Sequence, residues 1–283
     1  MIDGSFGASF GARLLGRLAE RGALCVGIDP HPGLLRDWGL ADDLAGLAAF
    51  TRTAVDALAD RVAVLKPQSA FFERHGSRGI AVLERVIADA RAAGALVLLD
   101  AKRGDIGSTV AAYAAAYLDP ASPLCADAVT ASPYLGFGSL APMVDAALAG
   151  GGGVFVLALT SNPEGGAVQR AVGGDGRTVA QSMVDGAAAV NAGADPIGSV
   201  GVVVGATVGE HGLDLARLHG PVLVPGLGAQ GGTAADVGRL FGPTARAVVP
   251  SMSREILRHG PDPAALRAAA TRATDELRTV LAG

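Results

Sequence analysis

The sequence has few cysteines and no excess of basic residues. Cys25 and Cys125 are its only cysteines, too few for the disulfide framework of a small secreted domain, and we expect a reducing, cytoplasmic compartment. Lys and Arg total 23 against 27 Asp and Glu, and this net charge of −4 argues against a nucleic-acid partner. It does not exclude a phosphorylated small ligand, because a few local groups can hold one phosphate.

Long apolar runs and an export signal are also missing. No stretch approaches the roughly 18 apolar residues that span a bilayer, so we expect no membrane segment. The first residues, Met1–Phe6, show no basic region followed by an apolar stretch, so we expect no signal peptide. These features predict a soluble cytoplasmic protein.

What the sequence does contain is a repeated alternation of strand-like and helix-like segments. Short runs that are apolar on both faces, as in buried parallel strands, alternate with Ala-rich stretches. The expected strands are Ala23–Ile28, Val62–Leu65, Ala95–Leu99, Ala128–Thr130, Val154–Leu159, Val200–Val204, Val222–Val224 and Ala245–Val249. The expected helices are Phe10–Arg21, Asp43–Leu58, Gly79–Ala92, Ser108–Tyr117, Ser139–Leu148, Val179–Ala192, Thr233–Leu240 and Pro263–Leu281.

Eight strand candidates in strict alternation favour a closed (β/α)8 TIM barrel over an open sheet. Such a barrel needs about 250 residues, so we expect residues 1–283 to form one domain with an additional N-terminal helix. No Pro/Ser/Gly linker divides the chain. The longest irregular segment is expected at Asn162–Asp175, after the fifth strand, either as a mobile loop near the site or as a plain surface insertion.

Charged residues follow several of the expected strands. Asp100 and Lys102 are two apart, so they point to the same face of an extended chain. A lysine held beside carboxylates stays protonated and can act as an acid. Asp29 alone is more often a helix cap, and Lys66 alone is more often a snorkelling lysine. For Asp100 and Lys102 a salt-bridged strand end is the less favoured alternative. Their convergence on one end of a barrel favours a catalytic pocket.

The run Gly226-Leu-Gly-Ala-Gln-Gly231 matches G-x-G-x-x-G after a strand. As a dinucleotide fingerprint it is weak, because no acidic residue ends the following strand. Barrels commonly bind phosphate with the loops after strands seven and eight, so we interpret it as a phosphate loop. Gln230 would donate a side-chain N–H, Ser253 a backbone N–H, and Arg254 a planar charged fork. The alternative is a tight glycine turn beside a surface arginine.

Metal and serine-nucleophile motifs are missing. The five histidines and two cysteines show no metal-ligand spacing, so we expect no metal site. His31 follows Asp29-Pro30 near the expected pocket, but a loop histidine without a role is the favoured interpretation. Ser132 lacks the G-x-S-x-G context of a nucleophile.

The segment Asp100-Ala-Lys102-Arg-Gly-Asp105-Ile-Gly-Ser-Thr109 resembles the active-site signature D-x-K-x-x-D-I-x-x-T of orotidine 5′-monophosphate (OMP) decarboxylases. The resemblance runs from Gly27-Ile-Asp29-Pro30 to Ser253-Arg254 and is closest in character to the longer bacterial subgroup. It implies decarboxylation of OMP to UMP, the last step of de novo pyrimidine biosynthesis, with neither a metal nor an organic cofactor.

The resemblance also implies roles for individual residues. Lys102 would donate the proton to C6 of the pyrimidine, and Asp100 would sit near the departing carboxylate. Asp105 and Thr109 would reach into the neighbouring subunit's site, which implies a homodimer with shared active sites. Lys66, Asp100, Lys102 and Asp105 would form an array of alternating lysine and aspartate side chains. Asp29 and Lys66 would bind the ribose hydroxyls, and Ser132 would contact the pyrimidine edge. Pro225 would line the pocket, and Gln230 with Arg254 would hold the phosphate.

Two other functions stay open on these residues. Magnesium-dependent sugar-phosphate lyases share D-x-K-x-x-D on the same barrel, but they carry an acidic residue where this chain has Lys66, so Lys66 favours the nucleotide enzyme. A non-catalytic sensor of a phosphorylated ligand would have no need for four fixed charges. Lys66 is followed by Pro67-Gln68 instead of the Gly and acidic residue of the compact enzymes, which leaves that loop's contacts open.

Overall fold

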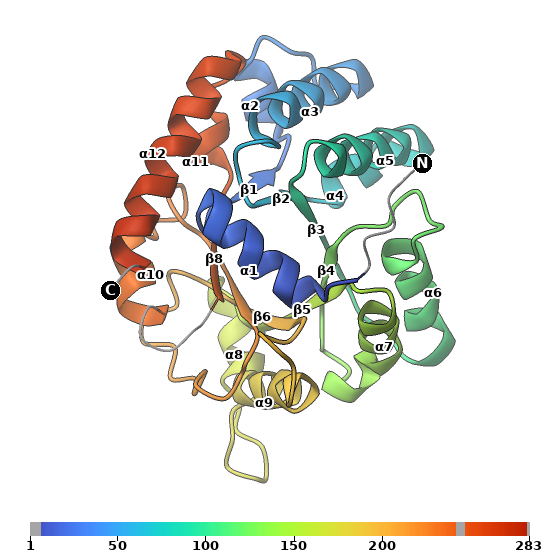
Figure 1. Ribbon diagram of the computed structural model, residues 1–283, viewed down its shortest axis with the longest axis vertical. Helices are drawn as coiled ribbons and strands as arrows, with labels where there is room; N and C mark the ends of the chain where they lie inside the picture. Colours follow the sequence, from blue (N-terminus) through green and yellow to red (C-terminus); the bar gives the residue numbers. More distant parts are fainter. Residues whose placement is uncertain (1–6, 242–246, 282–283) are drawn as a thin grey trace.

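The computed structural model describes residues 7–241 and 247–281. In it eight parallel strands close into one barrel, in which each strand pairs with the next and β8 pairs with β1 (Figure 1). The predicted (β/α)8 fold is confirmed. The strands are β1 (Cys25–Ile28), β2 (Val64–Pro67), β3 (Leu96–Arg103), β4 (Ala128–Ala131), β5 (Gly153–Leu159), β6 (Val200–Val204), β7 (Pro221–Pro225) and β8 (Ala247–Met252).

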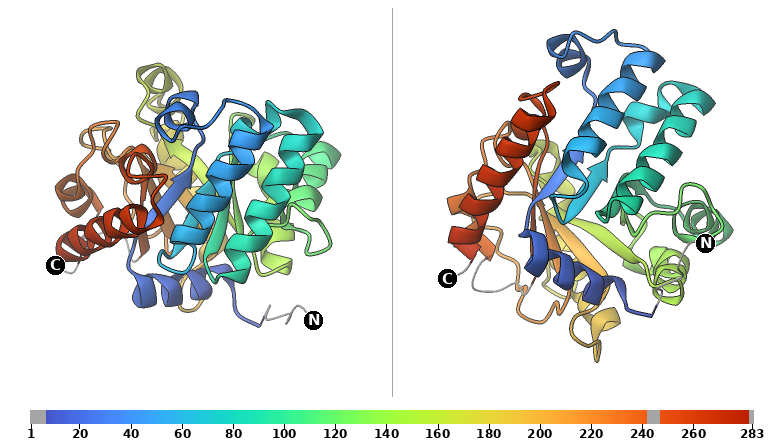
Figure 2. Two further views of the ribbon diagram at one scale, coloured as in Figure 1. Left: turned by 90° about the horizontal axis from the view of Figure 1, so that it is seen from above. Right: turned by 45° about the horizontal axis from the view of Figure 1, so that its top comes forward.

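Helices surround the barrel and cover the outer face of its strands (Figure 2). The expected bounds of the first and last helices are confirmed. The helices are α1 (Phe10–Arg21), α2 (Pro32–Asp37), α3 (Leu44–Leu58), α4 (Ala70–Glu73), α5 (Gly76–Ala92), α6 (Gly107–Leu118), α7 (Ala141–Ala149), α8 (Gly166–Gln169), α9 (Val179–Asn191), α10 (Ala234–Phe241), α11 (Arg254–Leu257) and α12 (Pro263–Leu281), with short 3-10 turns η1 (Phe137–Leu140) and η2 (Pro163–Gly165).

Two expectations about the connections need correction. The alternation is not strict, because residues 205–220 between β6 and β7 form turns without a helix. Gly209 and Gly212 there have φ of +70° and +66°, a left-handed conformation that interrupts a helix. The segment Asn162–Asp175 is not wholly irregular, since it contains η2 and α8.

Some expectations concern residues that the structure does not describe. Residues 1–6, on which the expectation about a signal peptide rests, lie outside the described residues. So do residues 245–246, where we expect the last strand to begin. β2 and β3 extend beyond their expected ends at Leu65 and Leu99. Polar residues that follow, such as Lys66 and Arg103, still pair with the neighbouring strands.

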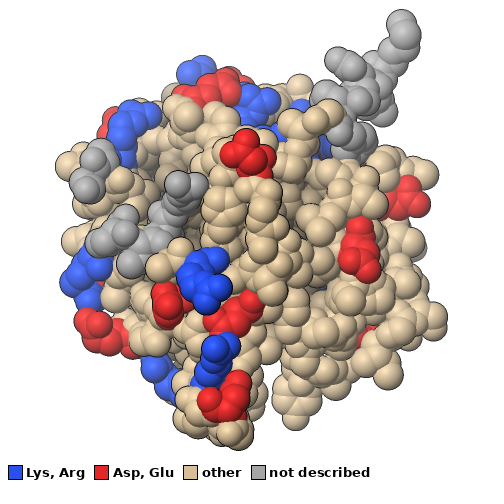
Figure 3. Space-filling model, turned by 60° about the horizontal axis from the view of Figure 1, so that its bottom comes forward, with Lys and Arg blue, Asp and Glu red and all other residues tan. Residues whose placement is uncertain are grey.

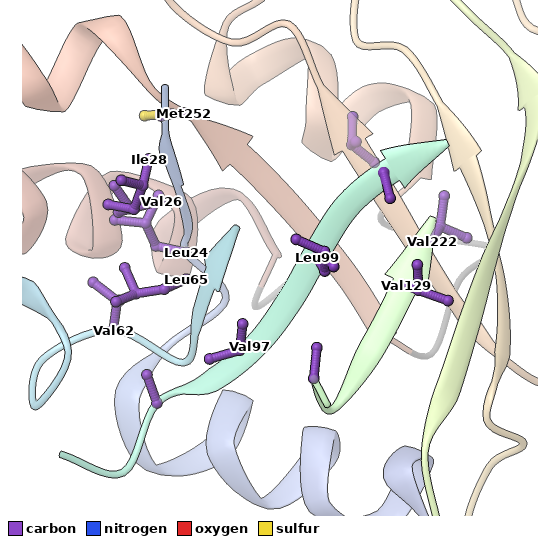
Figure 4. Packing of buried hydrophobic residues seen from close by; sticks show 14 of the residues in the cluster. Leu24, Val26, Ile28, Val62, Leu65, Val97, Leu99, Val129, Val222 and Met252 are labelled. Atoms are coloured by element: carbon purple, nitrogen blue, oxygen red, sulfur yellow. The ribbon is translucent and has the colours of Figure 1, made fainter. Parts of the chain in front are cut away.

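Alternate side chains of each strand enter two different hydrophobic clusters. Val97 and Leu99 of β3 point outward and pack in the large cluster between strands and helices (Figure 4). Leu96 and Leu98 belong to a smaller cluster inside the barrel. This period of two is the geometry of a strand buried on both faces. It decides which residues at the strand ends reach the barrel axis.

Helix α1 closes the N-terminal end of the barrel (Figure 2, left). Phe10 is 2% exposed and packs edge-on against Phe155, with ring centroids 6.0 Å apart. Arg13 Nη1 lies 2.6 Å from Asp127 Oδ1, a carboxylate that also accepts from the backbone of β3. A side chain at Gly153 would meet the Phe10 ring at 2.3 Å. The N-terminal end of the barrel is therefore filled by side chains, and the cavity lies at the end where the strands have their carboxyl termini.

Candidate active site

The polar strand-end residues reach the barrel axis because of the period of two. Val64, Leu98 and Ala128 point into the barrel. Two residues further along the same strands stand Lys66, Asp100 and Thr130, which therefore face the same interior. They line a cavity of about 500 Å3 at the carboxyl ends of the strands, where barrel enzymes place their active sites.

Asp100 lies between two lysines at the base of this cavity. Lys66 Nζ donates to Asp100 Oδ2 at 2.8 Å, and Lys102 Nζ donates to Asp100 Oδ1 at 2.6 Å. The side chains of Lys66 and Asp100 are 8% and 9% exposed, whereas that of Lys102 is 44% exposed. Lys102 is thus the member that faces the open cavity.

The buried pair of Asp100 and Lys66 stays ionised at neutral pH. Burial alone would raise the pKa of Asp100, but Lys66 and Lys102 outweigh it and hold this pKa well below its usual range. Burial alone would lower the pKa of Lys66, but Asp100 and Asp29 outweigh it and raise this pKa above its usual value. Two ammonium groups and one carboxylate leave positive charge available to an anionic reacting centre.

Gln68 lies in the loop after β2, whose contacts could not be predicted from the sequence. Its side-chain amide lies 2.9 Å from Asp100 Oδ2 and 2.7 Å from the Asp100 carbonyl oxygen, and both contacts are hydrogen bonds when the amide nitrogen faces them. Its backbone pairs with Asp100 in a parallel bridge. The loop after β2 therefore supports the central carboxylate.

The side of the cavity under β7 and β8 carries the residues expected to bind phosphate. Gln230, Ser253 and Arg254 line it, together with Pro225, which is expected to form the pocket wall. Gly226 has a φ of +102°, which turns the chain into the loop that carries Gln230. Within the described chain, Ser253 Oγ and Asp29 Oδ1 are buried and make no hydrogen bond. The serine hydroxyl can donate to a ligand phosphate, and the carboxylate oxygen can accept from a ligand hydroxyl.

Several cavity residues were not identified from the sequence. Thr160, Ser161 and Asn162 follow β5 and line the cavity, so the strand-end pattern applied elsewhere would have found them. His31, which we expected near the pocket but without a role, also lines it, with its ring edge-on to Phe71 at 4.5 Å between centroids. Burial lowers the pKa of His31, which Asp29 opposes and Arg254 reinforces, so its neutral form is favoured.

Comparison with known proteins identifies the family. The orotidine 5′-phosphate decarboxylase / HUMPS family profile matches residues 22–269. An orotidine 5′-phosphate decarboxylase from Salinispora arenicola is 67% identical over 275 residues, 97% of this chain and 99% of that protein. This chain belongs to the orotidine 5′-phosphate decarboxylase / HUMPS family.

Solved structures agree with this assignment. A crystal structure of a Streptomyces avermitilis protein assigned as an orotidine 5′-phosphate decarboxylase has a TM-score of 0.96 and 60% identity, covering 100% of this chain and 99% of that one. The structure of Leishmania donovani OMP decarboxylase has a TM-score of 0.74 and 32% identity, covering 97% of this chain and 99% of that one.

Three residues of the decarboxylase-like pattern do not line the cavity of their own chain. Asp105 accepts a hydrogen bond from the backbone N–H of Ile106 at 2.8 Å, and Thr109 is exposed on α6. Ser132 is half-buried beyond the end of β4. The structure therefore gives no support to a contact between Ser132 and the pyrimidine, while Ser161 does line the cavity.

The described residues also bear on membrane crossing, metal binding and the distribution of surface charge. Over residues 7–241 and 247–281, no helix is both long and apolar enough to cross a membrane. The same ranges contain no cluster of three or more His, Cys, Asp or Glu side chains suited to a metal. On the described part of the face in Figure 3, basic and acidic side chains are interspersed and neither forms a patch.

Proposed function

We propose that this protein decarboxylates OMP to UMP, the last step of de novo pyrimidine biosynthesis, by chemistry that needs neither metal nor organic cofactor. The observation that carries the proposal is the array in which Asp100 lies between Lys66 and Lys102 at 2.8 and 2.6 Å. Gln230 and Arg254 line the same cavity, and their chemistry suits a phosphorylated substrate. The relatives named above carry the name of this reaction.

The array fits the chemistry of the step. When the bond between C6 and the carboxylate breaks, CO2 leaves and the electron pair remains on C6, where the ring cannot delocalise it well. Fixed ammonium groups in a site shielded from water stabilise that charge. Lys102 then gives its proton from Nζ to C6, and solvent returns a proton to the amine. Asp100 Oδ1 lies 2.6 Å from this Nζ and accepts a hydrogen bond from the amine that gives the proton.

The opposite side of the cavity supplies binding energy. We propose that Arg254 and Gln230 hold the phosphate, assisted by the backbone of Ser253, and that Asp29 and Lys66 hold the ribose hydroxyls. An arginine fork gives a charge-assisted contact to phosphate. Binding of this remote phosphate orients the reacting ring over Lys102. Part of the binding free energy therefore lowers the activation barrier of the reaction.

We propose a homodimer with shared active sites. Asp105 and Thr109 do not line their own cavity, and each lies past the end of β3 where it can reach a second copy. The neighbouring strand-end segments expose apolar side chains, with Ile106 at 61% and Tyr134 at 79%. Apolar surface of this kind favours a protein interface.

We also propose a cytoplasmic location. Cys25 and Cys125 are both buried and unpaired in disulfides, as suits a protein in a reducing compartment.

One assay tests the proposed function. Purified protein treated with a chelator is incubated with OMP, and the loss of OMP absorbance is followed with identification of UMP. We expect full turnover after chelation. Activity that disappears with EDTA and returns with Mg2+ would favour the magnesium-dependent lyases. That outcome is disfavoured because ammonium groups already occupy both oxygens of Asp100. Binding without turnover would indicate a sensor.

A further inference from the structure

Thr130 is a buried hydroxyl that the mechanism above does not use. It lies in β4 and is 1% exposed. Its Oγ1 donates to Asp100 Oδ1 at 2.7 Å and accepts from the backbone N–H of Lys102 at 3.0 Å. A hydroxyl has one proton and two lone pairs, so it can serve one acceptor and one donor at once. Thr130 thereby joins the carboxylate and the backbone of the proton donor.

The backbone of β3 is irregular where Thr130 meets it. Leu99 pairs with Val129 and Arg103 pairs with Ala131, so four residue steps of β3 run beside two of β4. The extra length is taken up in a bulge that contains Lys102. Lys102 has a φ of +48°, a left-handed conformation that non-glycine residues rarely adopt. Such a conformation persists only where surrounding contacts determine it.

We propose that Thr130 is a positioning residue for catalysis. Its hydroxyl holds the Lys102 backbone in the left-handed bulge and orients Asp100 through Oδ1. The two effects together keep Lys102 Nζ at 2.6 Å from Asp100 Oδ1, facing the cavity. This inference rests on the proposed function, because it concerns the placement of the proposed proton donor. Thr130 acts through Lys102 and Asp100, and so differs from a group that protonates the substrate.

The residue type at 130 follows from these contacts. Valine has the shape of threonine but neither donates nor accepts, so it would leave the Lys102 N–H and one Asp100 contact unmade. Serine keeps the hydroxyl and loses only the methyl group. A role in positioning therefore predicts opposite behaviour for Thr130→Val and Thr130→Ser.

The chain offers a matched control in Thr51. It is also 1% exposed, and its Oγ1 donates to the Leu47 carbonyl at 2.9 Å within α3, on the outside of the barrel. Thr51→Val makes the same chemical change away from the cavity. A merely structural effect of losing a buried hydroxyl should appear in both valine variants.

The experiment compares kcat and KM for OMP in wild type, Thr130→Val, Thr130→Ser and Thr51→Val, with folded sites counted by calorimetric titration with UMP. We expect kcat of Thr130→Val to fall by about 10- to 100-fold per folded site, as for a small misplacement of a reacting group, while KM changes by less than about threefold. Thr130→Ser should keep kcat within about fivefold of wild type, and Thr51→Val should keep it unchanged.

Three kinetic results would overturn the proposal: a kcat for Thr130→Val equal to that of Thr51→Val, a change confined to KM, or a Thr130→Ser variant as slow as the valine variant. If Thr130→Val does not fold, Thr130→Ala replaces it in the same comparison. An inactive wild type would contradict the proposed function instead. A crystal structure of Thr130→Val then decides the positioning claim, which fails if Lys102 keeps its left-handed φ and its contact with Asp100.

Discussion

At the scale of single residues, the three charges at the base of the cavity depend on one another. Asp100 is buried with Lys66, and each is stabilised by its contact with the other. Removing one partner from a buried pair leaves an uncompensated charge and typically costs about 3–5 kcal/mol of stability. Lys102 is 44% exposed, so its loss leaves less charge buried. Its substitution is therefore the cleanest test of chemistry at this array.

We expect Lys102→Ala to remove nearly all turnover and to leave the fold intact, because it deletes the proton donor and one cation facing C6. Steady-state rates with OMP measure the first effect, and circular dichroism with thermal unfolding measures the second. Residual activity within tenfold of wild type corresponds to a barrier change of only about 1.4 kcal/mol and would show that Lys102 is not the donor.

Asp100 gives stability a pH dependence whose sign follows from its environment. Although burial opposes the shift, Lys66 and Lys102 lower the folded-state pKa of Asp100 below the ordinary value of 3.8, which the unfolded chain keeps. Its contribution is therefore present above the unfolded pKa and lost as pH falls toward the folded pKa.

We expect the difference in unfolding free energy between wild type and Asp100→Asn to shrink as the pH falls below about 4. Urea unfolding of both proteins from about pH 7 to about pH 3 measures it, because other carboxyl groups titrate alike in the two proteins and cancel. A difference that stays constant over this range would mean that the lysines do not depress the pKa of Asp100.

At the scale of elements, α1 and the carboxyl ends of the strands have separate roles, one in stability and the other in chemistry. The strand ends carry the polar groups of the cavity, while α1 fills the opposite end of the barrel with Phe10 and Leu14, which are 2% and 0% exposed. Ser9 is the N-cap of α1, and its Oγ accepts from the backbone N–H of Ala12 at 3.2 Å. Stability and chemistry are thus separable along the barrel axis.

We expect Phe10→Ala to lower the free energy of unfolding by about 3–5 kcal/mol through the cavity it leaves. The rate per folded site should stay near wild type, since Phe10 lies at the far end of the barrel from the cavity. Urea unfolding with parallel kinetics measures both. The control is Arg17→Ala on the same helix, whose ion pair with Glu20 is exposed, so its loss should change the free energy of unfolding little. Equal losses in both variants would contradict a core role for Phe10.

At the scale of the whole molecule, the closed barrel brings Lys66, Asp100 and Lys102 to one end, and the proposed dimer would add Asp105 to that site. Asp105, the fourth residue of the expected array, lies outside the cavity of its own chain. A second copy related by a two-fold axis would place the same segment over the partner's cavity and receive the partner's segment in return.

We expect mixing of Lys102→Ala and Asp105→Ala proteins, each nearly inactive alone, to restore activity. A mixed dimer holds one site with Lys102 from one chain and Asp105 from the other, and one site that lacks both. Up to about half of wild-type activity per mixed dimer should therefore return. Mass spectrometry of differently tagged chains verifies subunit exchange. No recovery despite proven exchange would show that Asp105 serves its own subunit.

Much of the fold could be predicted from local pattern. The expected α1 and α12 have the observed bounds, and β6 matches residue for residue, because apolar spacing and end signals are local properties of the chain. The ends of β2 and β3 were placed too early. A polar residue ends an apolar run in sequence, whereas a strand continues as long as its neighbour pairs with it.

For the site, the sequence by itself determined which charged groups stand at the strand ends, since Asp100 and Lys102 are two residues apart on one strand. Tertiary structure decided their partners. Thr130 and Lys66 meet Asp100 across 30 and 34 residues of sequence, through strand register and a bulge in β3 that no local spacing encodes. Short-range pattern specifies which way a side chain points, but barrel closure and register determine what it touches.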